Sequence, residues 1–168
     1  IWSHFIGPIK RIEKMIKEAG FYSKKIIGET PIESRSVTEE ETREKIIKEF
    51  IDKNSGLDIL LANPAACADS ISLHHTCHNA VYYDLSYNCA QYLQSLDRIH
   101  RVGGSELQSA NYYFLTYDKT IDRDILKTLQ DKAKRMYKVI ENDYSIYSMN
   151  MFDDEDEIAA YKKLFLNN

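Results

Sequence analysis

The sequence contains no long run of apolar residues. The longest, in "DILLANPAACA" and "NAVYYDL", fall far short of the roughly 20 residues that a membrane-spanning helix requires. No secretory signal peptide opens the chain. We therefore expect no membrane partner and a cytoplasmic location.

Cysteine is scarce as well. Cys67, Cys77 and Cys89 cannot all pair within one chain, and none belongs to a CxxC motif, so we expect reduced thiols. The run "HHTCH" at 74–78 offers ligands for zinc, but structural zinc sites draw their ligands from two separate knuckles, and this run has no second one. We expect no metal site.

Several catalytic motifs are also missing. The chain has no GxxxxGK[ST] phosphate loop, no GxGxxG after a strand, and no serine or cysteine nucleophile in a recognisable elbow. Any chemistry performed here must therefore be incomplete within this chain.

The overall charge does not identify a partner. The 168 residues, 43% hydrophobic and 29% charged, suit a single domain with a sizeable core. The net charge of -4 owes much to "DDEDE" at 153–157. When residues 153–168 are left out, with these five acidic side chains and the basic Lys162 and Lys163, residues 1–152 carry a net charge of only -1. A nearly neutral body can still bind phosphate through a local basic patch.

Apolar and polar stretches alternate in the rhythm of strands and helices. We expect strands near residues 1–5, 24–28, 57–62, 80–85 and 111–118, and helices near residues 8–20, 36–52, 88–103 and 121–142. The second helix can be opened by a capping box at Ser36 with Glu39 or at Thr38 with Glu41.

This order predicts an α/β fold with an open, mostly parallel sheet and helices on both faces. The unbroken apolar runs are typical of strands covered on both sides, and we expect Leu60, Leu61, Val81 and Tyr83 in the interior. Ligands of such sheets bind where strands end, so the loops after Phe5, Ala62 and Asp84 would gather at one edge.

The stretch "QSLDRIHRVGG" at 94–104 concentrates basic side chains. On a helix, Arg98 and Arg101 would share a face with Gln94 and Asp97 and would meet an anion there. Alternatively, Asp97 and Arg101 form an ordinary ion pair on a solvated face, because they stand four residues apart.

The pattern from Asp84 to Gly103 resembles motifs five and six of the C-terminal RecA-like lobe of superfamily two helicases, in particular the Swi/Snf-type DNA translocases. That family runs hydrophobic-D-x-x-W-N-P, then Q-A-x-D-R-x-H-R-x-G-Q. The residues here that fall in register without a gap are Asp84, Tyr87, Asn88, Gln94, Ser95, Asp97, Arg98, His100, Arg101 and Gly103. The likeness covers residues 1 to about 130: "IWSHF" resembles motif four, "IIGETPIESR" the family's glycine followed by an arginine, "ILLANPAACADSISL" motif five, and "KTIDRDIL" the segment after the last strand.

The resemblance implies a RecA-like fold and a role in ATP hydrolysis. Arg98 and Arg101 would point at the γ-phosphate of ATP held by a separate N-terminal RecA-like lobe and neutralise the charge that develops there. The further ATP-binding residues would be Gln94, Asp97, Ser70 and Ser72. ATP and Mg²⁺ would be bound mainly by that other lobe, so this chain would be part of an ATP-dependent helicase or translocase and inactive alone.

The second implied partner is DNA, in duplex form. The backbone-contacting residues would be Ser3, His4, Asn63 and Pro64. A modest basic surface would be added by Lys10, Arg11, Lys14, Lys17, Lys24 and Lys25, although these also suit a solvated helix face. The composition, rich in Ile, Lys, Asn and Tyr, suits a bacterial or phage protein that is nucleoid-associated when on DNA, with restriction, defence or repair as settings.

The chain departs from the family pattern in motif five, which is glycine-rich in the family but here carries residues 65–70, "AACADS", and about two extra residues between Leu73 and Val81. Tyr87 replaces the family tryptophan and Gly104 the glutamine. An alternative is therefore a catalytically degenerate lobe that serves as a nucleic-acid or protein docking module. We expect the helicase-like domain over residues 1–142, as a fragment, and an acidic, helical extension over 143–168.

Overall fold

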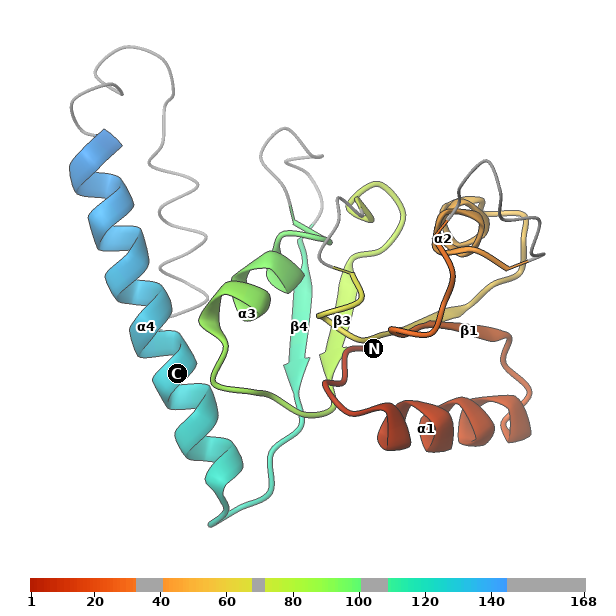
Figure 1. Cartoon of the computed structure of the whole chain (residues 1–168), viewed down its shortest axis with the longest axis horizontal. Coiled ribbons are helices and arrows are strands. Elements are labelled where there is room, and N and C mark those ends of the chain that lie inside the picture. Colours follow the sequence, from red (N-terminus) through yellow and green to blue (C-terminus); the bar gives the residue numbers. More distant parts are fainter. Residues whose placement is uncertain (33–40, 68–71, 101–108, 145–168) are drawn as a thin grey trace.

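The computed structural model describes residues 1–32, 41–67, 72–100 and 109–144 of the chain (Figure 1). Its elements are α1 (Ile6–Glu18), β1 (Ser23–Ile26), α2 (Arg43–Ile51), β2 (Ile59–Ala62), β3 (Asn79–Tyr82), α3 (Cys89–Leu96), β4 (Asn111–Phe114) and α4 (Ile121–Tyr144). None of the helices in these ranges has the length and apolar character needed to cross a membrane.

The strands form two parallel pairs that meet at Trp2. β1 pairs with β2 and β3 pairs with β4, while Trp2 bridges Ala62 at the end of β2 and Tyr82 at the end of β3 in parallel orientation. The Trp2 amide donates to the Val81 carbonyl at 2.7 Å. The expected open parallel α/β sheet is confirmed, and the expected strand at residues 1–5 is reduced to this short central bridge.

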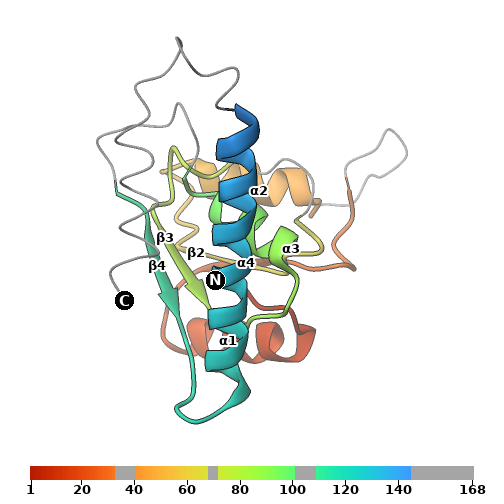
Figure 2. The same cartoon turned by 90° about the vertical axis from the view of Figure 1, so that its left-hand side faces the viewer.

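Helices cover both faces of the sheet, as predicted. Ile9 of α1 packs with Ile27 and Leu61 on one face. The neighbouring positions Ile26 and Leu60 point to the other face, because side chains alternate along a strand, and there they join the main core with α2, α3 and α4. Figure 1 shows α1 and α2 on opposite sides of β1, and Figure 2 shows α3 beside α4.

Tyr82 lies at the centre of the main core. Its ring stacks on Phe114 with centroids 4.9 Å apart, and its hydroxyl lies 2.8 Å from the Ser95 hydroxyl of α3. Burial raises the pKa of Tyr82, so the phenol stays protonated. α3 is therefore fixed to β3 by an aromatic contact and a buried hydrogen bond.

The predicted interior positions are only partly right. Leu60 and Leu61 are buried, but Val81 is half-buried and Tyr83 is 41% exposed, whereas Ala80 and Tyr82 are buried. The prediction for β3 was wrong by one residue because this strand is covered well on only one face. The run "AVYY" that precedes Asp84 has no charged position to reveal which face that is.

The start of α2 also differs from the prediction. The helix begins at Arg43, and Thr42 is its N-cap, with a side chain that accepts from the Lys45 amide at 3.3 Å. The expected caps Ser36 and Thr38, like their neighbours over 33–40, lie outside the described residues. The expected end near residue 52 is confirmed, as is the long final helix, which begins at residue 121.

The domain boundary at residue 142 remains a prediction. α4 runs without interruption through Tyr144, two residues beyond that boundary. The acidic extension over 145–168 lies outside the described residues.

Candidate functional site

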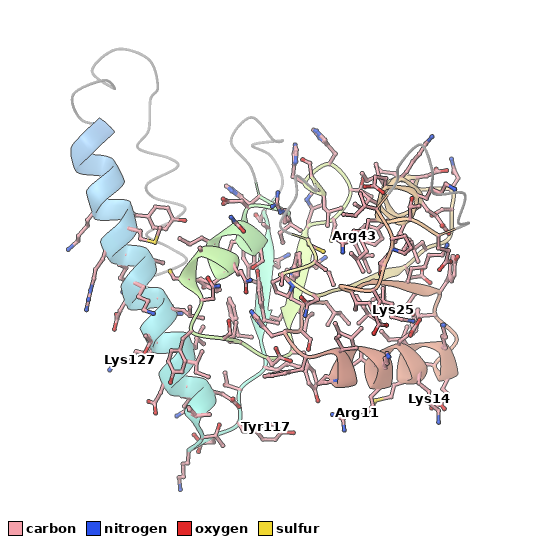
Figure 3. The ribbon with its side chains drawn as sticks, in the orientation of Figure 1. Arg11, Lys14, Lys25, Arg43, Tyr117 and Lys127 are labelled. Atoms are coloured by element: carbon pink, nitrogen blue, oxygen red, sulfur yellow. The ribbon has the colours of Figure 1, made fainter. Side chains whose placement is uncertain are left out.

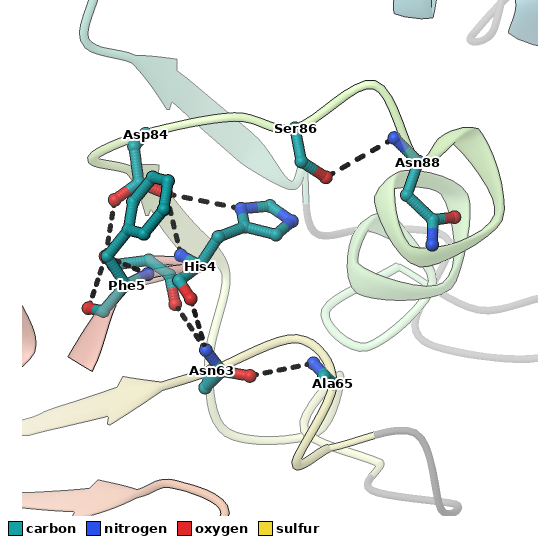
Figure 4. Close-up of polar contacts among 8 residues, drawn as sticks. His4, Phe5, Asn63, Ala65, Asp84, Ser86 and Asn88 are labelled. Carbon is teal, nitrogen blue, oxygen red and sulfur yellow. Dashed lines mark hydrogen bonds and ion pairs between the residues drawn. The ribbon is translucent and has the colours of Figure 1, made fainter.

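Four polar residues meet where the parallel strands end, and we name them the carboxyl-edge network: Ser3, His4, Asn63 and Asp84 (Figure 4). Ser3 and His4 follow Trp2, Asn63 follows β2, and Asp84 lies two residues after β3. Parallel strands bring their carboxyl ends to one edge, which is the usual ligand-binding edge of such sheets.

Asp84 is the acceptor at the centre of this network. Its Oδ1 accepts from the His4 amide at 2.7 Å and lies 3.2 Å from His4 Nδ1, and its Oδ2 accepts from the Ser3 hydroxyl at 2.5 Å. Burial acts to raise the pKa of Asp84, but these hydrogen bonds outweigh it and hold the pKa below its ordinary value. Asp84 is therefore an ionised anchor for the segment after Trp2.

Asn63 ties the same segment to the loop after β2. Its Nδ2 donates to the His4 carbonyl at 2.8 Å and to the Ser3 carbonyl at 3.2 Å, while its Oδ1 accepts from the Ala65 amide at 3.0 Å (Figure 4). The next residue, Pro64, is buried. Asn63 thus shapes the backbone of two loops at once.

The structure brings all four predicted DNA-contacting residues together, but their surroundings differ. Ser3 is 1% exposed and Pro64 is buried, so their side chains support the loops from inside. His4 is half-buried, with a side chain that is 15% exposed, and its Nε2 atom is itself buried without a hydrogen-bond partner within the described part of the chain. His4 is the member of the set with an unused polar atom.

Residues 83–88 join the end of β3 to α3, and Asn88 is the N-cap of this helix. The Asn88 side chain accepts from the Gln91 amide at 3.1 Å, and its own amide donates to the Ser86 hydroxyl at 3.3 Å (Figure 4). Gln94, on the last turn of α3, is exposed. Between Asp84 and Gln94 the chain therefore leaves the end of β3, passes Asn88 at the helix cap and enters α3.

The basic stretch after Gln94 does not continue the helix, contrary to our expectation. α3 ends at Leu96 with Asp97 as its C-cap, and residues 97–99 form a turn. The Arg98 carbonyl accepts from the Leu73 amide at 2.8 Å, and Ile99 is buried, so tertiary contacts turn the chain toward the loop before β3. Arg98 lies in this turn and not on α3, so the predicted helical face is wrong for Arg98, while Arg101 and the predicted helix end at Gly103 lie outside the described residues.

Arg98 contacts the loop after β2. Its Nη2 donates to the Cys67 carbonyl at 3.5 Å, in the loop that begins with Asn63, while its own carbonyl accepts from the Leu73 amide before β3. Of the other predicted ATP-binding residues, Ser72 is half-buried with its hydroxyl 2.7 Å from His74 Nδ1, Asp97 is exposed, and Ser70 lies outside the described residues.

The sequence did not single out Arg43. This first residue of α2 donates from Nε to the Thr30 carbonyl at 2.9 Å, from Nη1 to the Ala66 carbonyl at 2.8 Å and from Nη2 to the Gly28 carbonyl at 3.3 Å. The resemblance drew attention to Arg35, which lies outside the described residues. A lone arginine near a helix start carries no sequence signal for contacts with carbonyls of two distant loops.

Most of the expected basic surface is already paired. Glu13 pairs with Lys17 at 3.1 Å and with Lys25 at 2.6 Å, whereas Lys24 pairs with Glu41 and Glu49. Lys14 pairs with Glu18 on α1. These pairs favour the alternative of a solvated face, and Lys10 and Arg11 are the exposed members for which the described region provides no ion pair.

No metal centre is evident in the described ranges. No group of three His, Cys, Asp or Glu side chains there could hold a metal ion. A cavity of about 520 Å³ lies where β2 and β3 begin, at the edge opposite the carboxyl-edge network. Its lining is chiefly apolar, with Leu60, Leu73 and Ile99, and does not suit a polyphosphate.

Comparison with known proteins agrees with this geometry. Residues 4–103 match the family described as "Helicase conserved C-terminal domain". The chain is 25% identical over 167 residues to the "ATP-dependent DNA helicase DDM1" of Arabidopsis thaliana, covering 97% of this chain and 20% of that protein. It is 28% identical over 135 residues to the "Helicase SWR1" of Mycosarcoma maydis, covering 79% of this chain and 7% of that protein.

A solved structure shares the fold. The C-terminal part of the Fun30 ATPase domain superposes with a TM-score of 0.63 at 21% identity, over 76% of this chain and 37% of that one. The chain spans a fifth or less of the length of the two curated relatives named above. From its family match the chain belongs to the helicase conserved C-terminal domain family, and its parallel sheet has the fold of a C-terminal RecA-like lobe.

Proposed function

We propose that this chain is the second motor lobe of an ATP-dependent DNA translocase and supplies arginine fingers to ATP bound on a separate N-terminal lobe. The observation that carries the proposal is the placement of Arg98. The capped helix α3 and the turn at residues 97–99 place its guanidinium against the Cys67 carbonyl in the loop after β2, and Arg101 follows three residues later in the sequence. Guanidinium groups suit phosphate because their planar fork reaches two oxygens at once.

The residues fit one side of a nucleotide site. The described region offers the Arg98 guanidinium and the exposed amide of Gln94, with no phosphate loop and no cluster of three side chains that could hold a metal ion. ATP bound with Mg²⁺ on the other lobe would supply the phosphoryl group that water attacks. Arg98 and Arg101 would neutralise the developing charge, with Gln94, Asp97, Ser70 and Ser72 lining the same side.

The carboxyl-edge network would face the DNA backbone. His4 would be the contacting member, and its Nε2, which is buried and unpartnered among the described residues, would have to turn outward to meet a phosphate, whereas Ser3, Asn63 and Pro64 would hold the loops that carry it. Contacts of this kind position a protein on DNA without reading sequence. The relative in Arabidopsis is named a DNA helicase, which supports DNA as the track.

The test is ATP hydrolysis by the full-length protein with and without duplex DNA. We expect hydrolysis that duplex DNA stimulates and that residues 1–144 alone do not perform. Hydrolysis by residues 1–144 alone, or hydrolysis indifferent to duplex DNA and stimulated by RNA, would contradict the proposal.

The alternative of a catalytically degenerate docking module rests on one observation. In place of the family's glycines, the loop after β2 carries Ala65, Ala66 and Cys67, and the last two are buried. A full-length protein that binds DNA but hydrolyses no ATP would favour this alternative. As a motor lobe or as a nucleic-acid docking module the protein would be DNA-associated, whereas a protein docking module need not be. The named relatives are eukaryotic, and the bacterial or phage source remains a prediction.

A further inference from the structure

Arg43 joins two loops that are far apart in the sequence. Gly28 and Thr30 belong to the loop after β1, and Ala66 belongs to the loop after β2; all three present carbonyl oxygens to this one guanidinium. Figure 3 shows Arg43 beneath α2, toward the sheet. Its partners are backbone groups, and no carboxylate pairs with it among the residues described.

The backbone of Arg43 is fixed as well. Its amide donates to the Pro31 carbonyl at 2.9 Å, and Thr42 caps the same helix end. The guanidinium is therefore held from a rigid helix start, and three N–H directions of a planar fork are used in parallel. A lysine at this position could not span three carbonyls, because an ammonium is a compact point donor.

Two arginines hold consecutive carbonyls of the loop after β2. Arg43 binds the carbonyl of Ala66, and Arg98 binds the carbonyl of Cys67, the next residue. The same loop begins at Asn63, which supports His4. A displacement of this loop would therefore reach both the proposed finger and the proposed DNA-facing histidine.

We propose that Arg43 is a positioning residue for the lobe's part in ATP hydrolysis: it clamps the loop after β2 to the loop after β1, and so fixes the surroundings of Arg98. This inference rests on the proposed function. Loss of the clamp should lower the DNA-stimulated kcat by roughly 10- to 100-fold, because displacements of about 1 Å from outside the reacting groups have effects of this size. The KM for ATP should change less than threefold.

The experiment compares Arg43→Met and Arg43→Lys in the full-length protein by kcat, KM for ATP, thermal melting and amide hydrogen exchange at residues 65–67. We expect both variants to lose kcat and to exchange faster at this loop, with lysine restoring little. Thr42→Ala is the matched control, because it weakens the start of the same helix and keeps the guanidinium; it should lower the melting temperature and retain kcat. Lys127→Met, on the exposed face of α4, should change nothing.

Three results would overturn the clamp. They are a parental kcat in Arg43→Met, full rescue by Arg43→Lys, and an equal loss of kcat in Thr42→Ala, which would reduce the role of Arg43 to helix stability. If the parent itself shows no DNA-stimulated hydrolysis, the proposed function fails instead. Hydrogen exchange at residues 65–67 still decides the clamp in that case, and in any variant too unstable for the hydrolysis assay.

Discussion

The carboxylate of Asp84 accepts a hydrogen bond from the His4 amide at 2.7 Å, across 80 positions of sequence. The same carboxylate accepts from the Ser3 hydroxyl, so one ionised side chain fixes the segment after Trp2 against the end of β3. Its side chain is 18% exposed, which leaves little water to replace these bonds. The carboxyl edge is thus built around a half-buried negative charge.

Replacing Asp84 with Asn should destabilise the fold by about 1–3 kcal/mol, because the amide group cannot accept from all the donors that now converge on the carboxylate. Chemical denaturation at neutral pH measures this. Asp84→Glu keeps the charge but lengthens the side chain, so it should recover part of the loss. An Asn variant as stable as the parent would show that the network contributes nothing to folding.

The same residue should make stability depend on pH. Its folded pKa lies below the ordinary 3.8, so its contribution is complete above that value and is lost as the pH falls through the folded pKa. The difference in unfolding free energy between the parent and Asp84→Asn should therefore shrink between about pH 5 and pH 2. A difference that stays constant over this range would contradict the lowered pKa.

Cys67 should be the least reactive thiol among the three. It is 3% exposed, and burial raises its pKa to about 12, so thiolate is almost absent at neutral pH. Cys77 and Cys89 are both half-buried, but burial raises the pKa of Cys89, so Cys77 should react first with a chromogenic disulfide reagent. Rapid labelling of Cys67 in the native protein, identified by mass spectrometry, would show that the loop after β2 opens readily.

Thr42→Ala should destabilise α2 by about 0.5–2 kcal/mol, because it removes the acceptor for the Lys45 amide at the helix start. Thr42→Ser retains an acceptor and should recover most of this loss. Thermal melting of the three proteins is the measurement, and equal melting temperatures for the Ala and Ser variants would exclude a capping role.

The sequence was most informative where polar residues interrupt apolar runs. Asn63 and Asp84 follow the apolar segments of β2 and β3, so their arrival at one edge could be predicted from a parallel sheet alone. Asn88 could likewise be expected at a helix start, since its side chain caps the helix that follows.

What the sequence missed depends on long-range contacts. α3 ends before Arg98 because a carbonyl there binds the Leu73 amide, and nothing local in "LDRIHRVGG" forbids the helix from continuing to Gly103. The three carbonyl partners of Arg43 are set by the packing of α2 and not by residue type. Tyr82 is inside because its hydroxyl meets Ser95 on α3.

The most direct test of the account is steady-state ATP hydrolysis by full-length Arg101→Ala at saturating duplex DNA, with Arg98→Ala and Arg101→Lys beside it. We predict that Arg101→Ala loses about 10³-fold in rate and Arg98→Ala nearly as much, because the transition-state charge loses its donor. Arg101→Lys should also be slow, while DNA affinity and thermal melting change little. A folded Arg101→Ala protein that hydrolyses ATP at the parental rate would contradict the arginine-finger assignment.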